Sequence, residues 1–160
     1  MVPVVARLLL SPTPQALAWW APPLRAASGA ILIAFGAGKF LDHASEAASF
    51  TAYGLPRPGA FVYAVGAVEL GFGVLLVAGL ATRAAALVLA GNLAGAIATA
   101  GPVEGGPINL GLAPALLAAM LVLVWSGGGR LALDGLVKRR AASGNYRLST
   151  YERRTRCSSE

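Results

Sequence analysis

Two oppositely charged residues, Lys39 and Glu69, stand inside apolar stretches of the sequence. Glu69 lies near the middle of an otherwise uncharged run from about Gly59 to Leu80, and Lys39 lies near the end of a shorter run that begins at Leu24. A carboxylate at the centre of a bilayer costs roughly 2.5–3.5 kcal/mol on insertion scales, so it faces a bundle interior and takes a partner or a proton. Lys39 is the natural partner for Glu69.

Helix geometry favours contact between the two side chains. If the first helix starts near Leu24, Lys39 lies about 22 Å along it, whereas Glu69 lies about 16 Å inward from the opposite membrane face. Side chains lean toward the N-terminus of their own helix, so in antiparallel helices Lys39 and Glu69 lean toward each other. We therefore expect both to face the same interior space.

Two roles are open for this pair. It can act only as a structural ion pair between the first two helices, or it can form a polar pocket for the carbonyl or hydroxyl of a small ligand. Asn92 and Asp42 are further candidates for such a pocket. For Asn92 a hydrogen bond between helices is the stronger expectation.

The composition places these residues in a membrane. Of the 160 residues, 56% are hydrophobic and only 12% are charged, and the mean hydropathy is +0.66. Prolines, glycines and charges divide the apolar sequence into four segments, at about residues 24–41, 59–80, 84–100 and 110–125. A spanning helix needs about 20 residues. The sequence predicts an all-α integral membrane protein, a bundle of four transmembrane helices.

The segments between and within these spans carry further expectations. Gly91 and Gly95 have the GxxxG spacing that lets two helix backbones approach closely. Residues 101–107 are rich in proline and glycine and predict a loop. Arg25 and Arg83, at span ends, are expected to extend toward the lipid interface. His43 is expected to be a solvated loop residue or, less simply, a proton shuttle.

The chain divides into an N-terminal interfacial segment (1–23), a transmembrane domain (24–129) and a basic tail (130–160). The tail holds eight of the thirteen basic residues and three acidic ones, so it carries +5 of the net charge of +6. Basic residues directly after a span bind anionic lipid and control topology, so Lys138, Arg139 and Arg140 are expected to lie on lipid rather than on nucleic acid. The positive-inside rule places both termini in the cytoplasm.

Cys157 is the single cysteine and His43 the single histidine. An internal disulfide, a four-ligand zinc site, a cysteine-ligated cluster and a bis-histidine haem each need more ligands than these. We expect no metal site and no covalently bound cofactor. Any electron carrier would belong to a partner or be a diffusible ligand.

Five short motifs occur along the spans and turns: Arg25 with Gly29, Gly36-Ala37-Gly38-Lys39-Phe40, Gly54-Leu55-Pro56, Glu69-Leu70-Gly71-Phe72-Gly73, and Gly79-Leu80-Ala81-Thr82-Arg83. In combination they resemble the DoxX family of small four-helix bacterial membrane proteins. The likeness covers about residues 24–125.

The DoxX family includes relatives of the small subunit of thiosulfate:quinone oxidoreductase. The resemblance therefore implies a multi-pass protein of the bacterial cytoplasmic membrane, an accessory or small subunit of an oxidoreductase system that contacts quinone and other membrane subunits. It implies no catalytic residue, so whether the chain is itself an enzyme stays open. The alternative is a non-catalytic scaffold whose Gly91 and Gly95 face and basic tail recruit partners.

Overall fold

The structure is a computed structural model that describes residues 19–127 and 129, and every element in that part of the chain is a helix. The elements are α2 (Ala21–Leu41), α3 (His43–Ala52), α4 (Pro58–Ala78), α5 (Thr82–Glu104), a π-helix (Ile108–Leu112) and α6 (Ala113–Ser126). The basic tail, including Lys138, Arg139 and Arg140, and most of the predicted N-terminal segment lie outside the described residues.

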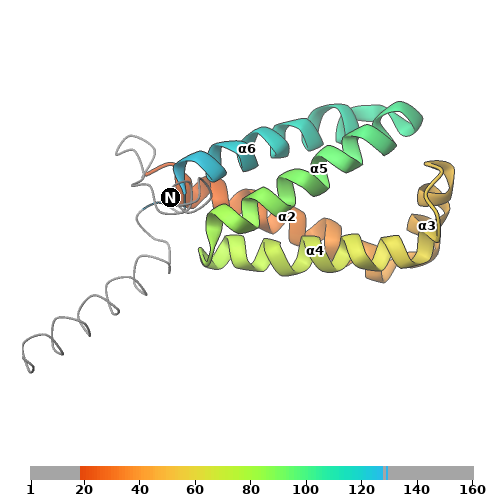
Figure 1. The fold of residues 1–160 in the computed structure, drawn as a ribbon, viewed down its shortest axis with the longest axis horizontal. Helices are drawn as coiled ribbons and strands as arrows, with labels where there is room; N and C mark the ends of the chain where they lie inside the picture. Colours follow the sequence, from red (N-terminus) through yellow and green to blue (C-terminus); the bar gives the residue numbers. More distant parts are fainter. Residues whose placement is uncertain (1–18, 128, 130–160) are drawn as a thin grey trace, which may run out of the picture.

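Four helices are long and apolar enough to cross a membrane: Ala21–Leu41, Pro58–Ala78, Thr82–Glu104 and Ile108–Ser126. They run alternately up and down, with α2 packed mainly on α4 and α5 mainly on α6 (Figure 1). The start of α2 and the end of α6 lie at one end of the bundle, and α3 lies at the other (Figure 1). The predicted four-helix membrane fold is confirmed.

Local sequence signals set the helix ends. Prolines occupy the first turns of α2 and α4, where a missing N–H costs no intrahelical hydrogen bond. Gly79 ends α4 with a φ of 72°, and the N–H of Leu80 donates to the carbonyl of Leu75 at 3.0 Å. This Schellman-type cap turns the chain into α5 within three residues.

Glycines let α2 and α4 touch through their backbones. A Cβ on Gly36 would lie 2.9 Å from the backbone nitrogen of Leu70 and 3.0 Å from the carbonyl oxygen of Gly66. One on Gly73 would lie 3.2 Å from the carbonyl oxygen of Gly29. Any side chain at these positions would force the helices apart.

Gly91 and Gly95 do not make a comparable contact within the chain. Both are exposed on α5, and a Cβ on either would meet nothing within 4 Å. Within this chain, the close approach of two helix backbones occurs instead between α2 and α4, at Gly29, Gly36 and Gly73. Packing of the α5 glycines against another chain stays a prediction.

The membrane-exterior segments are more helical than the sequence predicted. Residues 43–52 form α3, although His43 was expected to lie in a loop, since this alanine-rich stretch has good helix propensity. The loop expected from Gly101 starts later, because α5 continues through Pro102 to Glu104 and ends at Gly105 with a φ of 58°. A proline in the last turn removes little of the hydrogen-bond ladder, so the helix tolerates it.

The π-helix precedes Pro114, which has no N–H to donate and whose ring would clash with the carbonyl four residues earlier in a regular α-helix. The wider π turn at Ile108–Leu112 accommodates this. As a result the fourth span contains a bulge that presents Asn109 to the bundle interior, where it lines a cavity.

Arg25 and Arg83 are buried at the end of the bundle opposite α3, at 6% and 8% exposure, rather than extended toward lipid. Arg83 donates a hydrogen bond of 3.3 Å to the carbonyl of Trp125, in the last turn of α6. A cation there satisfies a carbonyl that the helix leaves unpaired and complements the helix dipole. This explains why Arg83 turns inward.

Candidate intramembrane ligand site

The ammonium of Lys39 and the carboxylate of Glu69 form the one ion pair found among the described residues, with Nζ and Oε2 2.9 Å apart. Lys39 is 9% exposed and Glu69 6%. The predicted contact between them is therefore present. Its role in ligand binding stays a hypothesis.

The glycines of α2 and α4 hold the pair in place. A Cβ on Gly36 would lie 3.0 Å from Cβ of Glu69, and one on Gly66 would lie 3.2 Å from Cβ of Lys39. Each charged residue thus has a glycine of the opposite helix against its own Cβ. Because the two helix backbones approach closely there, the side chains of Lys39 and Glu69 are near enough to form a direct ion pair.

Asn92 of α5 completes the group. Its Nδ2 donates a 3.0 Å hydrogen bond to Oε1 of Glu69, so both oxygens of the carboxylate accept a hydrogen bond. This is the interhelical bond expected for Asn92, and it ties α5 to α4. A buried carboxylate needs such partners, because leaving it bare in a low-dielectric interior is costly.

Lys39 has more donors than this network uses. An ammonium carries three N–H groups, and among residues 19–127 its only hydrogen-bond acceptor is Glu69. Lys39 also lines a cavity. The remaining donors can therefore serve an acceptor oxygen of a molecule in that cavity.

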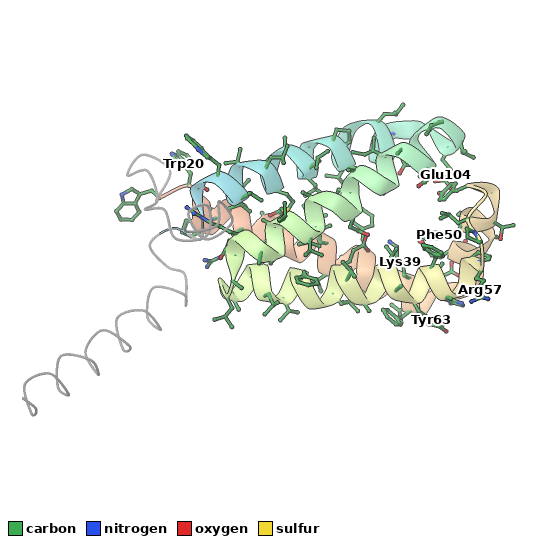
Figure 2. The ribbon with its side chains drawn as sticks, viewed as in Figure 1. Trp20, Lys39, Phe50, Arg57, Tyr63 and Glu104 are labelled. Atoms are coloured by element: carbon green, nitrogen blue, oxygen red, sulfur yellow. The ribbon has the colours of Figure 1, made fainter. Side chains whose placement is uncertain are left out.

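The cavity has a volume of about 260 Å³. Side chains of α2, α3, α4, α5 and the π-helix surround it: Phe35, Lys39, Glu46, Phe50, Tyr53, Val65, Glu69, Ala96, Thr99, Ala100, Glu104, Ile108 and Asn109. Figure 2 shows Lys39 inside the bundle, with Phe50 and Glu104 nearer to the end that α3 covers. We call the Lys39 and Glu69 pair the base of the cavity.

A smaller chamber of about 100 Å³ adjoins the base. Lys39 and Glu69 line it too, but most of its wall is apolar, with Leu32, Leu93 and Leu116 among its residues. A ligand at the base thus meets charge on one side and hydrocarbon on the other.

The opposite end of the cavity, which we call the mouth, is formed by Glu46, Phe50, Tyr53, Glu104 and Asn109. None of these five residues was predicted to belong to the site. Residues 46, 50 and 53 follow a spacing of four and three, which places them on one face of a helix, so the signal was present once α3 is recognised as a helix.

Hydrogen bonds organise the mouth. Glu104 accepts a hydrogen bond of 3.2 Å from the amide of Asn109. Burial, followed by the hydrogen bond to Glu104 and its charge, raises the pKa of Tyr53 to about 12. The phenol is therefore neutral and a donor at physiological pH.

The structure does not bring Asp42 and His43 to the cavity. Asp42 is exposed at the junction of α2 and α3, and its side chain is not part of the cavity wall. His43 begins α3 instead of lying in a loop, and its ring stacks on Tyr63 with centroids 4.0 Å apart. Of the four candidate pocket residues, Lys39 and Glu69 line the cavity. Asn92 bonds to Glu69 without being part of the cavity wall, and Asp42 stands apart.

The part of the chain that the structure describes contains no group of three or more histidine, cysteine, aspartate or glutamate side chains able to hold a metal ion.

These features define the chain as a multi-pass membrane protein of four helical spans with a charged pair buried between the first two. The chain belongs to the DoxX family, whose family model matches residues 21–102. The match runs from the start of α2 nearly to the end of α5 and includes Lys39, Glu69 and Asn92. No curated protein and no solved structure was found to match the chain.

Proposed function

We propose that the chain is a small accessory membrane subunit of an oxidoreductase system and that it binds quinone in the cavity through Lys39. One observation supports this above all: a buried ammonium with hydrogen-bond donors to spare lines an intramembrane cavity. The resemblance to relatives of the small subunit of thiosulfate:quinone oxidoreductase supports the same class of partner and ligand.

The base suits both redox forms of a quinone. A quinone carbonyl accepts hydrogen bonds, which Lys39 can donate, and a quinol hydroxyl donates one, which the Glu69 carboxylate can accept. Hydrogen bonds in which the donor or the acceptor is charged are stronger than hydrogen bonds between neutral groups. The chain's own residues bind and orient the ring, while electrons would pass to a redox centre in a partner subunit.

The dimensions fit a headgroup. Ligand cavities usually enclose roughly 300–1,000 Å³, and this one, at about 260 Å³, suits a single ring rather than a whole long-tailed quinone. The apolar chamber next to Lys39 and Glu69 suits the first carbons of a hydrocarbon tail. The rest of the tail would remain in lipid.

A scaffold without ligand is the second candidate function. The exposure of Gly91 and Gly95 on α5 favours it, since a small-residue face that packs on nothing within the chain is open to a helix of another subunit. In that case Lys39 and Glu69 would serve only to hold α2 against α4.

For location we propose the bacterial cytoplasmic membrane, with both termini in the cytoplasm and the tail on anionic lipid. The start of α2 and the end of α6 lie at the same end of the bundle, as this topology requires (Figure 1). Alkaline phosphatase fused after Glu160 should be inactive, and a fusion within residues 105–107 should be active. The opposite pattern would reverse the orientation.

Extraction of bound lipid tests the function. The protein, purified in mild detergent, should carry quinone detectable by mass spectrometry, whereas the Lys39→Met/Glu69→Gln double variant should carry little. Asp42→Asn is the matched control, because it removes a charge outside the cavity wall. Equal quinone content in all three preparations would favour the scaffold.

A further inference from the structure

The mouth of the cavity carries a charge that the base does not. The cavity wall contains three carboxylates, of Glu46, Glu69 and Glu104, and one ammonium, of Lys39. Lys39 neutralises Glu69 at the base. Within residues 19–127, neither Glu46 nor Glu104 has a basic side chain within ion-pair distance, so the mouth is electronegative.

Two aromatic rings stand beside these carboxylates. The ring centroids of Phe50 and Tyr53 are 5.7 Å apart, with the ring planes at 43° to each other. A cation is attracted to an aromatic face within about 6 Å of its centroid, so one cation can lie within reach of both rings. Tyr53 and Glu104 line the same cavity wall, and the charge of Glu104 contributes to the raised pKa of Tyr53.

We propose that the mouth binds an organic ammonium group, such as a trimethylammonium, between Phe50, Tyr53 and the carboxylates of Glu46 and Glu104. Aromatic rings combined with carboxylates recognise such groups because the cation is large, weakly hydrated and apolar at its surface. Among the described residues, no group of three or more histidine, cysteine, aspartate or glutamate side chains could hold a metal ion there. An anion would be repelled.

This site uses the mouth of the cavity, whereas the proposed quinone contact uses Lys39 at the base of the same cavity. The ammonium group has two possible sources, a free solute or the headgroup of a neighbouring lipid. The mouth lies at the end of the bundle that α3 covers (Figure 2), where headgroups would be within reach. Both sources present the same chemistry to the rings.

Choline is the probe for the test, and 3,3-dimethylbutan-1-ol, which has the same shape without the charge, is its control. Binding to the full chain in non-ionic detergent is measured by calorimetry. We expect choline to bind at least about tenfold more tightly than the alcohol. Equal affinity for the two would overturn the proposal.

Variants assign the site. Phe50→Leu and Glu104→Gln should each raise the Kd for choline by roughly three- to thirtyfold. If Glu104→Gln unfolds, Glu46→Gln replaces it as the carboxylate variant. Asp42→Asn removes the same charge nearby, outside the cavity wall, and should change the Kd less than about twofold. An effect of Asp42→Asn as large as that of the mouth variants would contradict the site.

Two further measurements distinguish a lipid headgroup from a free solute as the source of the ammonium group, and this proposal from the quinone proposal. In nanodiscs, phosphatidylcholine should weaken choline binding relative to phosphatidylglycerol if the source is a headgroup, and leave it unchanged if the source is a free solute; either result supports the chemistry. The Lys39→Met/Glu69→Gln variant removes a neutral pair and should still bind choline. Failure of the quinone proposal is thus distinguishable from failure of this one.

Discussion

The base and the mouth of the cavity use the same acidic residue type in opposite ways. At the base, Glu69 is 6% exposed and both of its oxygens accept hydrogen bonds, from Lys39 and Asn92. At the mouth, Glu46 and Glu104 are more exposed and have no basic partner among the described residues. The difference teaches that charge is balanced where lipid and protein exclude water and left unbalanced where water can solvate it.

The largest effect is expected from breaking the base. Lys39→Met or Glu69→Gln alone leaves one buried group without its partner and should lower the free energy of unfolding by about 3–5 kcal/mol. The double variant should lose less than the sum of the two, with a coupling of about 1–3 kcal/mol. Thermal unfolding in detergent measures all three variants. Strict additivity would mean that the two residues do not stabilise each other.

Substitutions at the glycine contact between α2 and α4, next to Lys39 and Glu69, should lower the free energy of unfolding by the next largest amount. Gly36→Ala places a Cβ within 3.0 Å of backbone atoms of α4 and should cost about 1–3 kcal/mol. Gly95→Ala is the control on α5, where a Cβ meets nothing within 4 Å, so it should be neutral or stabilise by up to ~1 kcal/mol. If both variants unfold at the same temperature as the native chain, the backbone contact of α2 and α4 is not needed for stability.

Helix geometry, applied to the sequence, predicted the contact at the base of the cavity but not the residues that form its mouth. The rise of about 1.5 Å per residue and the lean of side chains toward the helix N-terminus suffice to bring Lys39 and Glu69 together. The spacing of glycines along a helix does not show which helix packs against them. From the sequence alone, Gly91 and Gly95 therefore could not be told apart from the glycines at which α2 and α4 touch. His43 was expected to lie in a loop and no helix was predicted after Asp42, so the residues at 46, 50 and 53 had no common face. Burial of Arg83 depends on the end of α6, which is distant in sequence.

The smallest effect concerns the mouth at high pH. Since the fold raises the pKa of Tyr53 from 10.0 to about 12, the neutral phenol contributes stability that is fully present below pH 10 and is lost as the pH rises toward 12. Ultraviolet absorbance of tyrosinate, taken as the difference between the native chain and Tyr53→Phe, reports this titration. Ionisation of Tyr53 near pH 10 would show that its burial beside Glu104 does not persist in solution.

The affinity of a short-chain quinone for the Lys39→Met/Glu69→Gln variant tests the central claim most directly. This variant removes both charges together, and its unfolding temperature in detergent is measured beside the Kd, so a change in affinity of a folded variant reports the ligand contact rather than unfolding. A hydrogen bond from a charged donor contributes roughly 1.5–3 kcal/mol, and we therefore predict that the Kd rises about ten- to a hundredfold relative to the native chain. An unchanged Kd in a folded double variant would contradict a role for Lys39 in binding quinone.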